Sequence, residues 1–205
     1  MQSENHKKTI YAAILGAGTV GTGVYKLCQE MKSEFVQKTG ADLVVKKVLV
    51  RNASKKREGI EDAVLTDNWK EIIEDPEIDI VIEVMGGIEP AKTYIIEALE
   101  AGKQIVTANK DLLAEHGQEV MAAAEKAGAD LEFEAAVAGA IPIIRPLKQS
   151  MAGNRISEVM GIVNGTTNYI LTKNVRKRHG LCRSIGTGNR AWLCGSRPDS
   201  RCGRI

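Results

Sequence analysis

The 205-residue sequence has no apolar run of the length that a membrane-spanning helix needs. Its first residues, MQSENHKK, are polar and lack the apolar stretch of a secretory signal peptide. Cysteine is nearly absent from residues 1–173, which contain only Cys28. Because Cys28 lies within a helical pattern of apolar residues, we expect it to be a buried structural thiol. We therefore expect a cytoplasmic protein with no membrane partner and no catalytic cysteine.

Acidic residues are nearly missing from the last 32 residues of the chain. This segment, 174–205, holds eight Lys and Arg against one Asp, whereas residues 1–173 hold 20 Lys and Arg against 25 Asp and Glu. It also contains three of the four cysteines, Cys182, Cys194 and Cys202. The formal net charge of +2 thus describes neither part, and the functional interpretation rests on residues 1–173.

The basic tail suggests two functions that its other residues disfavour. A nucleic-acid-binding arm would need aromatic residues for stacking, and the tail has only Trp192. A zinc site would need closely spaced ligands, but the three cysteines form no Cys-x-x-Cys pair and His179 is the one imidazole nearby. We expect no nucleic-acid partner and no zinc.

In residues 1–141, strand-like apolar runs alternate with amphipathic stretches, which is typical of a parallel sheet with crossover helices. Helices are expected at 88–101 and 112–127, each ended by a glycine. Expected strands lie at 9–15, 43–50, 78–84, 104–107 and 130–134. The pattern predicts an α/β fold of the Rossmann type, a doubly wound parallel sheet.

Residues 142–173 follow a different pattern, with a helix expected near 142–151, a strand at 156–163 and another element from 167 to 171. This order predicts the start of a second, incomplete α+β domain. Apolar residues in 174–205 follow neither helical nor alternating spacing, so we expect that segment to be disordered.

A glycine pattern, Gly16-x-Gly18-x-x-Gly21, follows the first expected strand and opens a helix. Such glycines allow a tight turn, close approach of a pyrophosphate, and close packing of the helix on the strand. The first amides of the helix, at Thr19 and Val20, would face the anion with the helix dipole behind them. The sequence predicts a dinucleotide cofactor at these five residues.

Arg51 stands at the end of the second expected strand, where NAD-preferring sites have an acidic residue for the ribose hydroxyl. Lys55, Lys56 and Arg57 follow closely, and such a group of cations suits the 2′-phosphate of NADP. The alternative is a solvated basic loop, in which case NAD remains possible.

Three segments resemble homoserine dehydrogenases: 106–110 (VTANK), 134–142 (EAAVAGAIP) and 161–171 (GIVNGTTNYIL). The resemblance runs from about residue 10 to residue 173. It implies NADP-dependent interconversion of L-homoserine and L-aspartate 4-semialdehyde, in threonine and methionine biosynthesis, and a homo-oligomer in the intact protein. It also implies that residues 142–173 are the start of the family's α+β catalytic and dimerisation domain. A non-catalytic NADP-binding module is the alternative.

The resemblance also implies roles for single residues. Lys110 would lie beside nicotinamide and substrate, where an ammonium polarises the aldehyde oxygen during hydride transfer; the alternative is a surface lysine. Gly165 and Thr166 would contact homoserine, although a polar turn between strands would have the same sequence. Main-chain carbonyls would bind sodium or another monovalent cation in a loop that otherwise indicates only a hinge. The matching positions are Glu134, Val137, Gly139 and Ile141.

After Lys173 the family would continue with a helix and an acidic segment that includes substrate ligands, followed by a lysine proposed as proton donor. A one-base shift of reading frame in the adenine run at Lys173 would explain their absence. For example, residues 191–196, AWLCGS, can be encoded by bases that in the adjacent frame give Leu-Gly-Tyr-Ala-Glu-Ala. We therefore expect little or no dehydrogenase activity from this 205-residue chain.

Overall fold

The computed structural model describes residues 8–139, 141–161, 168, 169, 171 and 172. The chain divides into two compact units, one that ends at Leu147 and one that begins at Lys148. The predicted disorder of residues 174–205 lies outside the described residues. No helix in the described part of the chain is long and apolar enough to cross a membrane.

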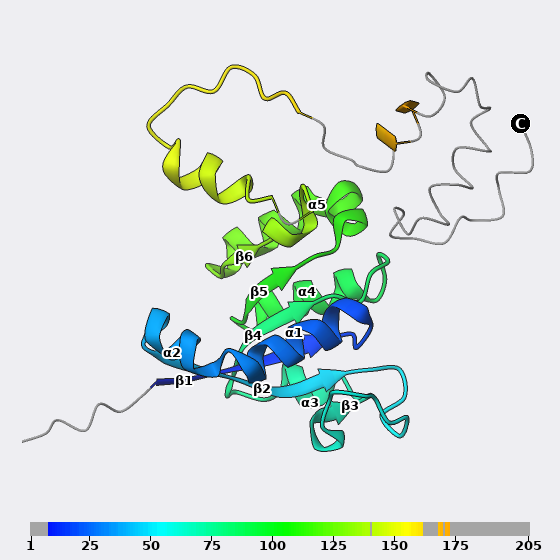
Figure 1. The fold of residues 1–205 in the computed structure, drawn as a ribbon. Coiled ribbons are helices and arrows are strands. Elements are labelled where there is room, and N and C mark those ends of the chain that lie inside the picture. The colour runs from blue at the N-terminus through cyan, green and yellow to red at the C-terminus, as the bar shows by residue number, and fades with distance from the viewer. Residues whose placement is uncertain (1–7, 140, 162–167, 170, 173–205) are drawn as a thin grey trace, which may run out of the picture. The chain divides into compact units, whose positions relative to one another are not determined.

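The first unit is built on a six-stranded sheet in the order β3-β2-β1-β4-β5-β6, with every pair parallel (Figure 1). Strand order reverses between β1 and β4, which is where open α/β sheets bind their ligands. The predicted Rossmann-type fold is thereby confirmed. The strands are β1 (Lys8–Leu15), β2 (Ala41–Leu49), β3 (Leu65–Thr66), β4 (Ile78–Glu83), β5 (Gln104–Thr107) and β6 (Leu131–Glu132).

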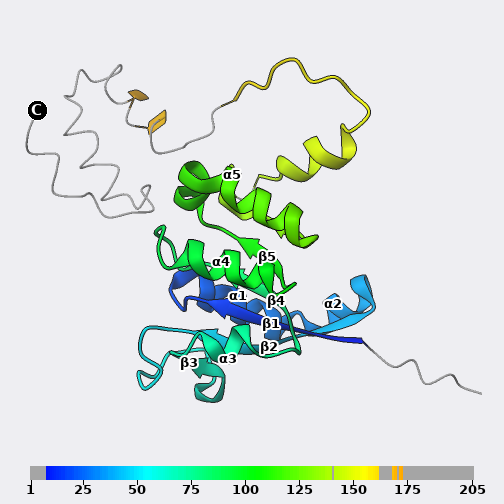
Figure 2. The same cartoon turned by 180° about the vertical axis from the view of Figure 1, so that it is seen from behind.

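Helices cover both faces of this sheet, which Figures 1 and 2 show from opposite sides. They are α1 (Thr19–Glu30), α2 (Lys32–Thr39), α3 (Lys70–Ile73), α4 (Ala91–Glu100) and α5 (Lys110–Ala127), with short turns η1 (Asp62–Val64), η2 (Glu134–Ala136) and η3 (Pro146–Ser150). Side chains of β1 alternate between faces: Ile14 packs in a cluster with α1, whereas Ala13 and Leu15 pack in a cluster with α3, α4 and α5. These two apolar layers hold the sheet rigid beneath the site.

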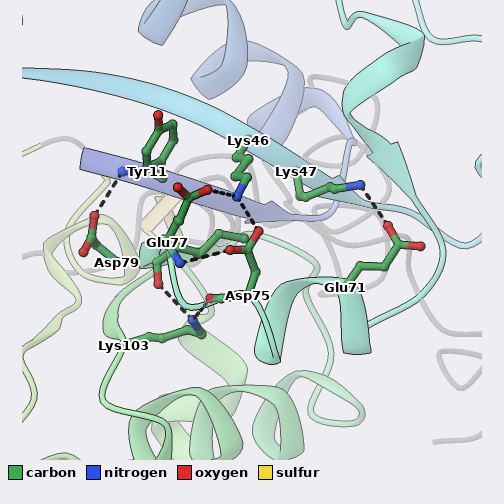
Figure 3. A network of polar contacts seen from close by, with 9 residues as sticks. Tyr11, Lys46, Lys47, Glu71, Asp75, Glu77, Asp79 and Lys103 are labelled. Carbon is green, nitrogen blue, oxygen red and sulfur yellow. Dashed lines mark hydrogen bonds and ion pairs between the residues drawn. The ribbon is translucent and has the colours of Figure 1, made fainter. Parts of the chain in front are cut away.

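A polar network closes the edge of the sheet where β4 and β5 begin (Figure 3). Lys103 is buried, and its Nζ donates to the main-chain oxygens of Asp75 at 2.7 Å and Ile78 at 2.9 Å. Burial lowers the pKa of Lys103. Lys46 Nζ lies 2.6 Å from Asp75 Oδ2 and 2.5 Å from Glu77 Oε2, and its hydrogen bond lowers the pKa of Asp75. Through these contacts Lys103, directly before β5, is joined to the segment that opens β4.

Sequence and structure differ mainly in short elements. The five predicted strands are present with ends shifted by at most two residues, and glycines with positive φ end α4 and α5 as expected, at Gly102 and Gly128. The sequence analysis missed α2, α3 and the two-residue strand β3, because elements that short show no apolar period. It also missed the kink in α5 at His116, whose φ is −128°.

Beyond residue 141, the prediction was partly wrong. The helix expected at 142–151 is present in shorter form, because residues 144 and 145 are α-helical and continue into the π-helical segment η3. The strand expected at 156–163 is absent over 156–161, because no described residue pairs with its backbone; 162 and 163 lie outside the described residues. Residues 168, 169, 171 and 172, in and beside the element expected at 167–171, are helical.

Candidate functional site

A cavity of about 430 Å³ lies at the carboxyl ends of β1, β2 and β4. The strand ends are level with one another, since Leu15 pairs in register with Leu49 of β2 and with Glu83 of β4. The turns that follow these strands therefore meet around one space. The residues that line it include Gly16, Gly18, Arg51, Arg57, Gly86 and Glu89.

At two positions of the turn after β1, the backbone conformation and the packing within the protein require glycine. Gly16 has φ +103°, and its N–H donates to Leu49 O at 2.9 Å. A Cβ at Gly16 would lie 3.0 Å from Met85 Cα. Gly21 is buried in α1, where a Cβ would lie 1.9 Å from Gly16 O. These glycines let the turn close and the helix pack on the sheet.

Gly18 differs from these two glycines, because the absence of a side chain there leaves open space at the surface of the protein. A Cβ there would meet no atom of the described chain within 4 Å. Gly18 is the N-cap of α1, no side chain caps the helix, and its first turn has no acidic residue. Thr19 and Val20 are exposed beside it. Free amides and open space above a helix N-terminus fit a dinucleotide pyrophosphate.

Two arginines border the cavity on the β2 side. Arg51 is exposed and lines the cavity two residues after β2 ends. Arg57 lines it as well, and its Nη1 donates to Ala17 O at 3.4 Å. Lys55 and Lys56 are not among the described residues that line this space. The structure thus brings Gly16, Gly18 and Arg51 together, as predicted for a cofactor site.

Glu83 is a fully buried carboxylate at the end of β4 that the sequence analysis missed. It accepts hydrogen bonds from Met85 N at 2.8 Å and Thr107 Oγ1 at 2.7 Å. Asn109 Nδ2 lies 3.4 Å from Glu83 Oε1 and donates to Gly87 O at 2.6 Å. These contacts fix the turns after β4 and β5 to each other. The sequence feature that could have indicated this buried carboxylate is a Glu at the end of an otherwise apolar strand.

Lys110 is the first residue of α5, directly after this network. Asn109 caps the helix, accepting a hydrogen bond from Leu112 N at 3.1 Å. The Lys110 side chain is 60% exposed, and its Nζ lies 3.2 Å from Asp111 Oδ1. It is not among the described residues that line the cavity. The backbone at Lys110 is therefore fixed at the carboxyl edge of the sheet, while its ammonium faces solvent.

The loop that leaves β6 is tied down by Glu134. Its carboxylate accepts three main-chain hydrogen bonds, from Ile143 N, Ile144 N and Arg145 N at 2.6, 2.9 and 2.8 Å. The first of these donors contributes most to lowering the pKa of Glu134. The loop then turns sharply, because Ala138 has φ +55° and Gly139 has φ +49°.

Of the other residues predicted here, Val137 N donates to Glu134 O at 3.1 Å and Ile141 is 68% exposed. No three His, Cys, Asp or Glu side chains of the described chain are grouped for a metal ion. Gly165 and Thr166, predicted to contact substrate, lie outside the described residues.

A family model described as "Homoserine dehydrogenase, NAD binding domain" matches residues 16–134, which include the glycine turn, Arg51 and Lys110. The chain belongs to the homoserine dehydrogenase family. A second model, "Homoserine dehydrogenase", matches residues 142–183, so the similarity continues past Lys173. The predicted family and the nicotinamide class of cofactor are confirmed.

Individual relatives agree with this assignment. Homoserine dehydrogenase from Bacillus subtilis (strain 168) is 47% identical over 172 residues, which are 83% of this chain and 40% of the relative. The crystal structure of a homoserine dehydrogenase from Thiobacillus denitrificans matches with a TM-score of 0.84 at 38% identity, over 94% of this chain and 44% of that one. A hyperthermophilic archaeal homoserine dehydrogenase in complex with NADPH matches with a TM-score of 0.73 at 25% identity, over 93% and 63%. The chain spans less than half of the bacterial relatives.

Proposed function

We propose that residues 1–141 are the NADPH-binding domain of a homoserine dehydrogenase. The observation that supports this best is the open space over Gly18, at an uncapped helix N-terminus, with Arg51 on the same cavity. The dinucleotide would lie with its pyrophosphate over the first amides of α1 and its adenosine toward Arg51. A guanidinium at that place favours the 2′-phosphate of NADPH over the free hydroxyl of NADH.

Titration of the purified chain with each reduced cofactor, followed by nucleotide fluorescence, tests this proposal. We expect saturable binding of both, with NADPH bound about tenfold or more tightly, because a charge-assisted hydrogen bond to phosphate is lost in NADH. A preference for NADH would contradict the NADP assignment. No binding of either cofactor by folded protein would contradict the site itself.

The reaction proposed for the intact protein is the interconversion of L-homoserine and L-aspartate 4-semialdehyde. The nicotinamide supplies or accepts the hydride, and Lys110 would hold positive charge near the reacting oxygen. The network of Glu83, Thr107 and Asn109 fixes the turn on which Lys110 stands, so only its flexible side chain needs to move toward substrate. Gly165 and Thr166 are proposed substrate contacts, and the intact protein is proposed to be a cytoplasmic homo-oligomer.

A shift of reading frame near Lys173 is proposed to explain the basic tail. It is supported by the change from 25 acidic residues in 1–173 to one in 174–205. The nucleotide sequence tests it directly. An adjacent frame that encodes the acidic segment of the family is expected, and an adjacent frame without it would contradict the proposal.

A monovalent cation such as sodium is proposed to bind main-chain carbonyls of Glu134, Val137, Gly139 and Ile141. The Glu134 carboxylate is engaged by three N–H groups, and its main-chain oxygen accepts one hydrogen bond from Val137 N, so a cation would bind the second lone pair of that oxygen. Successive positive φ values at Ala138 and Gly139 support a loop whose carbonyls turn inward. The ion would supply positive charge that holds this hinge. A melting temperature that rises with sodium chloride but not with choline chloride would support the site, and equal responses would contradict it.

A further inference from the structure

Besides Arg51, the loop after β2 contains Lys55, Lys56 and Arg57, and the structure separates Arg57 from the two lysines. Lys55 and Lys56 are exposed; the Lys56 side chain is 91% exposed and lies 4.0 Å from Asp62 in an ion pair. Arg57 is half-buried, lines the cavity, and donates from Nη1 to Ala17 O within the glycine turn. Of these three cations, Arg57 alone is among the described residues that line the cavity.

Arg57 is also held in place from the side of its backbone. Its carbonyl accepts a hydrogen bond from Ile60 N at 3.2 Å, and Ile60 is 6% exposed in the apolar cluster beneath α1. Between them Gly59 has φ +82°, and the Lys26 side chain of α1 packs so closely that a Cβ there would lie 2.1 Å from Lys26 Cε. The backbone of the turn is therefore anchored through buried Ile60, and the guanidinium is held at the glycine turn by its hydrogen bond to Ala17 O.

The guanidinium of Arg57 has N–H donors that are not used by any described acceptor. Its Nε is buried and has no hydrogen-bond partner among the described residues. A guanidinium has five N–H donors, and one of them, at Nη1, is used by Ala17 O, so further donors of this cavity-lining residue can serve an anionic acceptor. Asp67 and Glu89 line the cavity too, but Arg57 and Arg51 both stand on the loop after β2, where adenosine is expected.

We propose that Arg57 is the second specificity-determining residue for NADPH and binds the adenosine 2′-phosphate together with Arg51. The proposal rests on the proposed function of the cavity as a cofactor site. Two planar guanidinium forks match the oxygens of one phosphate, which a flexible ammonium such as that of Lys56 matches less well. The pyrophosphate, the other anion of the cofactor, would instead lie over the α1 amides beside Gly18.

Titration of NADPH and NADH into four forms of the chain tests this: unsubstituted, Arg57→Ala, Arg57→Lys and Lys56→Ala. For Arg57→Ala we expect NADPH affinity to fall about tenfold to a hundredfold, with NADH affinity changed less than about threefold. Lys56→Ala removes the same charge from the same loop, and we expect less than about a twofold effect on either cofactor because the pair is exposed. Arg57→Lys should lie between Arg57→Ala and the unsubstituted chain.

Two results would overturn the role of Arg57. An equal loss of both cofactors would mean that Arg57 holds the glycine turn rather than the 2′-phosphate, and an unchanged NADPH affinity would mean that it holds neither. Thermal unfolding of each variant checks the fold, and Arg57→Lys, which keeps the aliphatic stem, provides the same comparison if Arg57→Ala unfolds. If the unsubstituted chain is folded but binds neither cofactor, the proposed function fails as well.

Discussion

Gly21→Ala is expected to lower the free energy of unfolding by about 3 kcal/mol, because the added methyl group would overlap with backbone atoms. Its carbon would lie 1.9 Å from Gly16 O and 2.9 Å from Gly16 C, which are backbone atoms of the glycine turn. Either α1 or the turn must move. Since the turn forms the floor of the cavity, NADPH affinity should fall by more than about tenfold in the protein that still folds.

Gly23→Ala is the matched control, two residues further along the same helix. A Cβ at Gly23 meets nothing within 4 Å in the described chain, and the position is exposed. Alanine is a better helix former than glycine, so stability should rise by up to about 1 kcal/mol with NADPH affinity unchanged. Chemical denaturation and cofactor titration measure both variants. Equal behaviour of the two would contradict the account of helix packing.

Lys110→Ala is expected to lower turnover about a hundredfold or more in a full-length version with the frame restored after Lys173, because charge stabilisation at the reacting oxygen is lost. The effect should fall on kcat more than on the affinity for NADPH. Steady-state oxidation of L-homoserine with NADP⁺ measures it. The unsubstituted 205-residue chain, assayed alongside, should show little or no turnover.

Lys126→Ala removes the same charge from the last turn of α5, where the side chain is exposed. It controls for general effects on the helix and should keep near-normal turnover. Near-normal turnover of Lys110→Ala would refute the catalytic role and leave Lys110 as a surface lysine paired with Asp111. Failure of the restored protein to oxidise homoserine at all would contradict the proposed reaction.

The glycine turn and the sheet could be predicted because local sequence determines them. Gly16 has the positive φ of the turn, Gly21 packs against Gly16, and Gly18 leaves space at the helix N-terminus, all within a six-residue segment. The strands β1, β2 and β4 carry buried apolar side chains on both faces because helices cover both. The same logic gave the glycine ends of α4 and α5.

Contacts between distant segments could not be predicted in the same way. Arg57 stands next to Lys56 in sequence, and only its hydrogen bond to Ala17, 40 residues away, distinguishes the two. In the sequence, Glu83 does not differ from other acidic residues at strand ends; only the folded structure shows its contacts with Thr107 and Asn109. The strand expected at 156–163 failed for a related reason, since a β-strand requires a neighbour that its own sequence does not contain.

Hydrogen exchange of the purified chain with and without saturating NADPH tests most directly the central claim that this cavity holds the cofactor. We expect slower exchange at the amides that open α1, in the loop from Arg51 to Arg57 and in the turn after β4. Amides at the opposite edge, around Asp75 and Lys103, should respond least. Protection concentrated at that opposite edge, or no protection by NADPH anywhere, would contradict the claim that this cavity holds the cofactor.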